Sequence, residues 1–90
     1  MNLGLGGKVA IVTGSGQIVG KQMAITLAEE GARVVINDIF PEKVEKTVAE
    51  LKEKGHPALG GTADVTVYKQ VQAMVDRVVN EFGRIDILVN

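Results

Sequence analysis

The chain has 90 residues, with 10 Lys or Arg and 11 Asp or Glu, so its net charge at pH 7 is −1. This near-neutral balance and the lack of a basic stripe in the sequence argue against a nucleic-acid partner, and the longest apolar stretch is far too short to span a membrane. There are no cysteines, which excludes disulfides and thiolate metal sites and favours a cytoplasmic protein with no metal centre.

Short apolar runs predict four strands. They cover residues 9–12, 34–36, 58–62 and 85–89. The second run stops at Asn37-Asp38, and the third is the weakest because it contains Gly60-Gly61. Continuous runs of this kind are typical of strands that are buried on both faces of a parallel sheet.

Helical spacing of apolar residues predicts three helices between these strands, over residues 18–30, 41–54 and 67–82. In the first helix one face is formed by Gly20, Met23, Ala24, Leu27 and Ala28. Gly31, Gly55 and Gly83 follow the three helices as stops, and Thr66 is the expected N-cap of the third.

The alternation of strands and helices predicts an α/β fold. It is a Rossmann-type, doubly wound parallel sheet whose first four strands lie in the order 3-2-1-4, with three right-handed crossover helices. Residues 1–90 are interpreted as the amino-terminal half of a single Rossmann domain. The topological switch point, where such sheets bind their ligand, then lies between the first and fourth strands.

A glycine-rich loop joins the first strand to the first helix. Gly14 can form the tight turn, Gly16 can admit a phosphate without a Cβ in the way, and Gly20 lets the helix approach the strand. The helix N-terminus then offers free N–H groups to a pyrophosphate, so the loop predicts dinucleotide binding. The alternative is a glycine turn that serves packing only.

Asp38 ends the second strand, where its carboxylate can accept hydrogen bonds from the adenosine ribose of NAD and repel the 2′-phosphate of NADP. No Lys or Arg stands at residues 15–17 or at Ile39 to compensate. The alternative is an Asp that ends a strand in a solvated turn. Asp64 and Val65 follow the third strand, where they could contact adenine or simply begin a helix.

Together these segments resemble the short-chain dehydrogenase/reductase family. TGSGQIVG at residues 13–20 is similar to the family's TGxxxGxG loop, Asp38 to its NAD-selecting acid, and Asp64-Val65 to its adenine-contacting pair. Residues 86–90 resemble the run into its NNAG motif. The resemblance implies hydride transfer between NAD(H) and a small alcohol or carbonyl substrate in a homo-oligomeric parent protein. It implies cofactor contacts by Gly14, Ser15, Gly16, Gln17, Ile18, Gly20, Asp38, Ile39, Asp64, Val65 and Asn90.

The chain departs from the family pattern in two places. Ile18 replaces the middle glycine of the loop, where a branched side chain crowds the phosphate. The family's catalytic Ser and its Tyr and Lys four residues apart are not found, because Tyr68 is followed four residues later by Gln72. We therefore expect no catalytic residue in this chain, which looks cut at Asn90. His56 is interpreted as a solvated turn residue.

The expected cut also predicts that an isolated 1–90 polypeptide aggregates, exchanges strands or stays partly unfolded, because its fourth strand would be a bare apolar edge. Two rival functions remain. One is a non-catalytic nucleotide-sensing or scaffold protein with the same fold. The other is a methyltransferase, which usually carries an acidic residue just ahead of its glycines, where this chain has Val12-Thr13.

Overall fold

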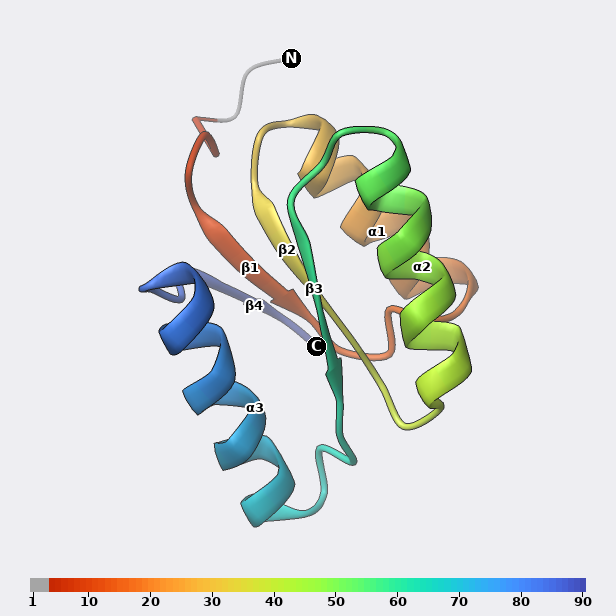
Figure 1. Cartoon of the computed structure of the whole chain (residues 1–90), viewed down its shortest axis with the longest axis vertical. Coiled ribbons are helices and arrows are strands. Elements are labelled where there is room, and N and C mark those ends of the chain that lie inside the picture. Colours follow the sequence, from red (N-terminus) through yellow and green to blue (C-terminus); the bar gives the residue numbers. More distant parts are fainter. Residues whose placement is uncertain (1–3) are drawn as a thin grey trace.

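The computed structural model describes residues 4–90 and shows a four-stranded sheet between two layers of helices (Figure 1). The elements follow one another as β1 (Val9–Val12), α1 (Ile18–Glu29), β2 (Arg33–Asp38), α2 (Pro41–Glu53), β3 (Ala58–Thr62), α3 (Tyr68–Phe82) and β4 (Ile87–Val89). This is the predicted alternation of strands and helices.

All strand pairs are parallel, and the sheet order is β3-β2-β1-β4, which confirms the predicted 3-2-1-4 topology. In register, Ile11 of β1 lies between Val35 of β2 and Leu88 of β4. The chain therefore reverses its direction of travel across the sheet after β3, and the switch point lies between β1 and β4 as expected.

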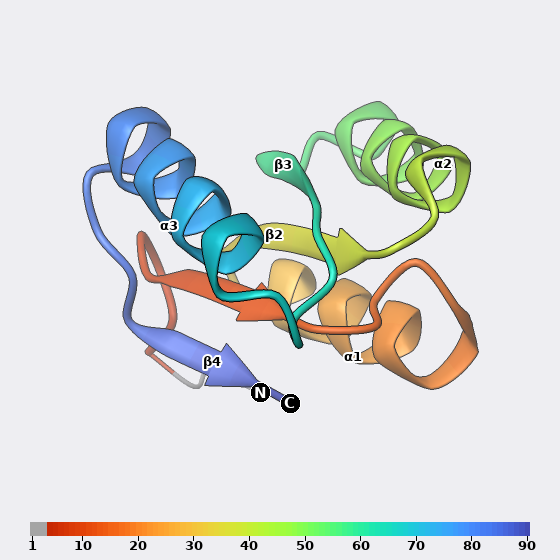
Figure 2. The ribbon, with the colours of Figure 1, turned by 90° about the horizontal axis from the view of Figure 1, so that it is seen from below.

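Alternate residues of the strands face two separate cores. Val12 and Ile36 pack with Ala24 of α1 and Leu51 of α2, whereas Ile11 packs with the residues of α3. Figure 2 shows α3 on one side of the sheet and α1 on the other. The continuous apolar runs follow from this arrangement, since both faces of β1 and β2 are covered.

The Gly60-Gly61 pair of β3 has a packing reason. A Cβ on Gly60 would lie 2.9 Å from a methyl carbon of Val44 in α2, and a Cβ on Gly61 would lie 2.7 Å from the sulfur of Met74 in α3. The two glycines therefore let helices approach both faces of the strand closely.

Three local expectations are wrong. Thr66 is not an N-cap: both its N–H and its hydroxyl donate to Oδ1 of Asp64, so Val67 becomes the N-cap and α3 begins at Tyr68. Met23 is not on the buried face of α1, since 42% of its surface is exposed. β4 begins at Ile87, because Asp86 turns its carboxylate to the N–H of Val9 and to Arg84.

The predicted helix stops are confirmed at the backbone level. Gly31, Gly55 and Gly83 all have positive φ angles, of 98°, 84° and 80°, a conformation that glycine adopts without strain. No helix in the described part of the chain has the length and hydropathy needed to cross a membrane.

Candidate functional site

The carboxyl ends of the four parallel strands lie at one edge of the sheet, and the sequence-predicted site residues follow those ends. The glycine loop follows β1, Asp38 ends β2, Asp64-Val65 follow β3, and Asn90 follows β4. Ligands of open α/β sheets bind at this edge.

The glycine loop has the geometry that its sequence predicts at two positions. Gly14 has a φ of 63°, as expected for the tight turn. A Cβ on Gly20 would lie 2.5 Å from the carbonyl oxygen of Gly14 and 3.0 Å from the Cα of Ser15, so only glycine allows α1 to approach the loop this closely.

Ser15 connects the loop to β2 rather than pointing outward. It is fully buried, its N–H donates to the carbonyl of Asn37 at 2.7 Å, and its hydroxyl donates to the carbonyl of Val12. The N–H of Asn37 in turn donates to the Ser15 hydroxyl at 2.9 Å. Both donors of Ser15 are therefore used within the protein, where they hold the glycine loop against β2.

The first turn of α1 leaves backbone donors available. Its N-cap, Gln17, makes no side-chain capping bond, and the first N–H with a backbone acceptor is that of Lys21, which donates to Gln17 at 2.9 Å. Among residues 4–90 no hydrogen bond accepts the N–H groups of Ile18, Val19 and Gly20. Such a helix N-terminus, with its positive dipole end, can hold an anionic group.

Asp38 is buried, which excludes the solvated-turn alternative. Only 5% of its surface is exposed, and its Oδ1 accepts from the N–H of Ile39 at 2.8 Å. Its Oδ2 is buried without a hydrogen-bond partner. A buried carboxylate oxygen without a donor is costly, so this atom fits a ligand that brings hydroxyl donors, as the ribose of a dinucleotide does.

Gly16 lies directly against this carboxylate. A Cβ on Gly16 would lie 3.0 Å from Oδ2 of Asp38 and 3.0 Å from the Cβ of Lys43 in α2. The missing side chain therefore lets the backbone of the loop lie close to both the Asp38 carboxylate and the first turn of α2.

Asp64 is held in a turn, where Thr66 donates to its Oδ1 from the backbone N–H at 2.9 Å and from the hydroxyl at 2.6 Å. These two bonds favour the charged form and lower the pKa of Asp64, so it stays an acceptor at neutral pH. The neighbouring Val65 is exposed, with its apolar side chain available to a ligand.

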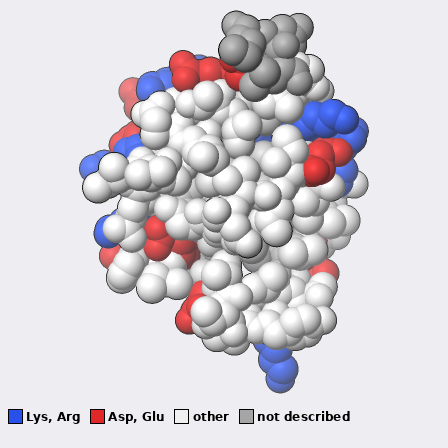
Figure 3. Space-filling model, turned by 180° about the vertical axis from the view of Figure 1, so that it is seen from behind, with Lys and Arg blue, Asp and Glu red and all other residues white. Residues whose placement is uncertain are grey.

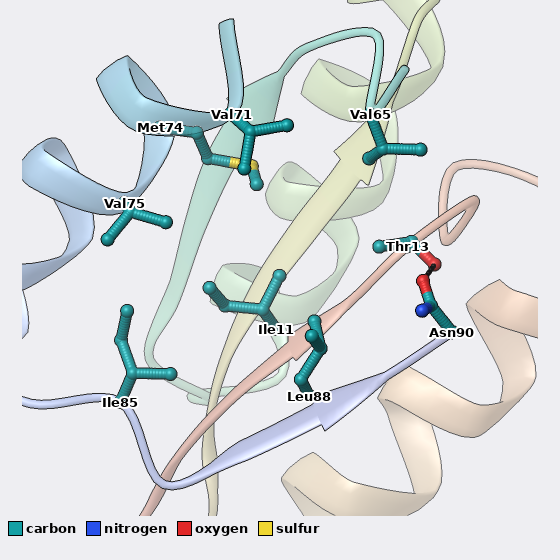
Figure 4. Close-up of a pocket in the computed structure, with 9 residues that line it drawn as sticks. All are labelled: Ile11, Thr13, Val65, Val71, Met74, Val75, Ile85, Leu88 and Asn90. Carbon is teal, nitrogen blue, oxygen red and sulfur yellow. Dashed lines mark hydrogen bonds between the residues drawn. The ribbon is translucent and has the colours of Figure 1, made fainter. Parts of the chain in front are cut away.

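Thr13 is a site residue that the sequence reasoning did not single out. Its hydroxyl donates to Oδ1 of Asn90 at 3.0 Å, and its N–H donates to the carbonyl of Val89 at 2.9 Å, so it connects the ends of β1 and β4 (Figure 4). The feature of the sequence that could have indicated Thr13 is its place as the first residue of the TGSGQIVG string, directly after a buried strand.

Thr13 and Asn90 line one end of a cavity of about 280 Å³. Figure 4 shows that apolar side chains line the rest of this cavity, with Val65 beside its polar end. The apolar lining residues are Ile11, Val65, Val71, Met74, Val75, Ile85 and Leu88.

The face of the molecule that carries β4 and α1 is largely uncharged. Charged side chains lie mostly around its rim (Figure 3), and the exposed apolar residues of the two elements include Ile18, Val19, Met23 and Leu88. Ile18, the substitute for the family's glycine, is 87% exposed and therefore fills no space in the core.

Tyr68 and His56 lie apart from these site residues. Tyr68 is the first residue of α3, is exposed, and has its hydroxyl 3.4 Å from Oε1 of Gln72. His56 is half-buried in the turn between α2 and β3. Within residues 4–90 no three His, Asp or Glu side chains gather as a metal-ligand set.

The fold and the candidate site are those of a doubly wound α/β protein, whose parallel sheet carries a glycine loop and a buried acid at its switch-point edge. The sequence profile described as short chain dehydrogenase matches residues 8–90. The chain belongs to the short-chain dehydrogenase family of oxidoreductases.

Individual relatives agree with this assignment. The chain is 50% identical to the (2S)-[(R)-hydroxy(phenyl)methyl]succinyl-CoA dehydrogenase subunit BbsD of Thauera aromatica, over 98% of this chain and 36% of that protein. A 7α-hydroxysteroid dehydrogenase solved with NADH and 7-oxo glycochenodeoxycholic acid is 40% identical, with a TM-score of 0.92, over 96% of this chain and 34% of that one.

A short-chain dehydrogenase/reductase from Burkholderia phymatum, solved in complex with NAD, is 33% identical with a TM-score of 0.90, over 93% of this chain and 30% of that one. The chain thus spans about a third of the length of the relatives it matches.

Proposed function

We propose that residues 1–90 form the amino-terminal half of a single Rossmann domain that binds NAD(H) for an oxidoreductase. The observation that carries this proposal is the buried Asp38 carboxylate, whose Oδ2 has no partner and lies against Gly16 of the loop that leads into the uncapped N-terminus of α1. The ribose hydroxyls donate to Asp38, and the pyrophosphate accepts from the N–H groups of Ile18, Val19 and Gly20.

The remaining predicted contacts complete the site. Gly14, Gly16 and Gly20 shape the loop, Ser15 and Gln17 position it, Ile39 and Val65 pack against the adenine, and Asp64 accepts from its amino group. Asn90 lies at the nicotinamide end. When bound, NAD(H) supplies hydride acceptance and donation, and the residues of this chain orient it and exclude water.

For the whole protein we propose oxidation of an alcohol or reduction of a carbonyl on a small-molecule substrate. The catalytic Ser, Tyr and Lys of the family belong, in this proposal, to a part of the protein outside this chain. We also propose that the protein is a homo-oligomer and that it works in the cytoplasm. Light scattering after size-exclusion chromatography measures the oligomeric state.

Fluorescence titration of the intact protein with NADH, NADPH and S-adenosylmethionine tests the function. We expect NADH to bind at least about tenfold more tightly than NADPH, because the charge of Asp38 opposes a 2′-phosphate at short range. Binding of S-adenosylmethionine instead of NADH would favour a methyltransferase. Tight NADH binding without hydride transfer to any alcohol or carbonyl would favour a nucleotide sensor.

A further inference from the structure

Asn37 is a buried amide to which the proposed function assigns no role. It is the last residue but one of β2, only 2% of its surface is exposed, and in register it lies beside Gly61 of β3. A buried amide is costly unless hydrogen bonds offset its desolvation, so its partners show what it holds in place.

The side-chain amide of Asn37 donates at the end of β3. Its Nδ2 lies 2.8 Å from the carbonyl oxygen of Gly61 and 3.2 Å from that of Ala63. The sulfur of Met74 in α3 lies 3.5 Å from the same nitrogen. An amide nitrogen carries two N–H groups, so the two carbonyls match its donors, and an alkyl side chain would leave both carbonyls without them.

The peptide unit that joins Ala63 to Asp64 is held on both sides. Its carbonyl oxygen accepts from Asn37, and its N–H donates to Oε1 of Gln70 in α3 at 2.8 Å. A peptide unit is planar, so fixing its oxygen and its N–H fixes the direction in which the chain continues. Asp64 therefore leaves β3 in one direction, and Thr66 holds its Oδ1, which leaves Oδ2 to accept from a ligand.

The backbone of Asn37 contacts the glycine loop as well. Its N–H donates to the hydroxyl of Ser15 at 2.9 Å, and its carbonyl accepts from the N–H of Ser15 at 2.7 Å. One buried residue thus sets the place of the turn at Asp64 relative to the loop that follows β1.

We propose that Asn37 and Gln70 are positioning residues for the adenine end of the dinucleotide. They hold the peptide unit between Ala63 and Asp64 so that the Asp64 carboxylate meets the amino group of adenine. This inference rests on the proposed function. Neither residue touches the cofactor in this proposal, because both act through Asp64.

The test compares NADH with reduced nicotinamide hypoxanthine dinucleotide, in which an oxygen replaces the amino group of adenine. Fluorescence titration of the intact protein gives the two dissociation constants. We expect NADH to bind at least about tenfold more tightly, because a hydrogen bond to a charged acceptor contributes that much. In the Asn37→Ala and Gln70→Ala proteins we expect the two constants to lie within about threefold, since Asp64 is no longer held toward the amino group.

Two control variants separate positioning from general damage. Gln72→Ala is the same substitution in the same helix, and Gln72 bonds Tyr68 and Asp76 rather than the turn at Asp64. Val9→Ala removes fully buried volume at the opposite end of the sheet, so it measures the effect of lost stability alone. Both controls should keep the ratio of the two constants within about twofold of the unaltered protein, since neither site contacts the turn.

Gln70 is exposed, so Gln70→Ala decides the question even where Asn37→Ala does not fold. A ratio that Gln70→Ala leaves unchanged overturns the positioning role, as does an unaltered protein that binds both dinucleotides equally well. In either case the binding of NADH still supports the proposed function. Failure of the unaltered protein to bind NADH overturns the function as well.

Discussion

Gly20→Ala tests the packing that holds α1 against the glycine loop. The added Cβ would lie 2.5 Å from the carbonyl oxygen of Gly14, about 0.9 Å closer than the 3.4 Å at which ordinary contact begins. The three nearest atoms are all backbone, so no side chain can rotate away.

Two effects of this substitution oppose each other. Overpacking a core costs about 1–3 kcal/mol, with rigid neighbours favouring the upper end, whereas replacing glycine by alanine within a helix gains about 1 kcal/mol. We therefore expect Gly20→Ala to lower the free energy of unfolding by about 1–2 kcal/mol.

Urea denaturation of the intact protein measures this difference. Gly6→Ala is the matched control, since a Cβ there meets nothing within 4 Å and Gly6 does not have a positive φ. A Gly20→Ala protein as stable as the Gly6→Ala protein would refute the reasoning, because the alanine would then fit without displacing α1.

Three further predictions concern the cofactor loop and the acid limit of stability. Asp38→Asn should lower the preference for NADH over NADPH about tenfold by removing the opposing charge, as measured by fluorescence titration, and an unchanged preference contradicts it. Gly16→Val should abolish NADH binding, because the added side chain would reach the Asp38 carboxylate. Ile18→Gly should leave NADH binding equal or improved, since the Ile18 side chain is exposed. Calorimetry measures both affinities, and a strong loss of affinity in the Ile18→Gly protein would contradict the roles given to Gly16 and Ile18. Arg84 lowers the pKa of Asp86, with help from the N–H of Val9, so this stabilisation is present above the unfolded pKa of about 3.9 and is lost as pH falls through the lower folded value. Arg84→Gln should therefore reduce the urea midpoint at pH 6 but hardly at pH 3, and a constant difference across that range speaks against the linkage.

The fold could be predicted because its signals are local and consistent. Continuous apolar runs such as 9–12 need two covered faces, and Gly14 and Gly20 mark a turn and a close approach that only glycine permits. Even the weakest predicted strand, Ala58–Thr62, forms as expected, although its two glycines argue against a strand by propensity.

The parts that sequence reasoning missed depend on which groups meet in space. Thr66 has the composition of an N-cap, but its two donors are taken by Asp64. Ser15 fits a phosphate loop by its position, yet its donors bond Asn37 and Val12.

The hydrogen bond between Thr13 and Asn90 joins residues that are 77 apart in the chain, so no local sequence pattern predicts it. The position of Lys43 could not be predicted from local sequence either. Its place in the sequence, in the first turn of the second helix, does not indicate a neighbour, and only the packing of α2 against the glycine loop places its Cβ beside Gly16.

The central claim is that the switch-point edge of this sheet binds NAD(H) through Asp38 and the N-terminus of α1. A crystal structure of the intact protein with NAD⁺ tests it most directly. We predict ribose hydroxyl oxygens within about 2.5–3.0 Å of the Asp38 carboxylate, and the pyrophosphate accepting from the N–H groups that begin α1. A dinucleotide bound elsewhere, or bound here with Oδ2 of Asp38 still unpartnered, would contradict the account.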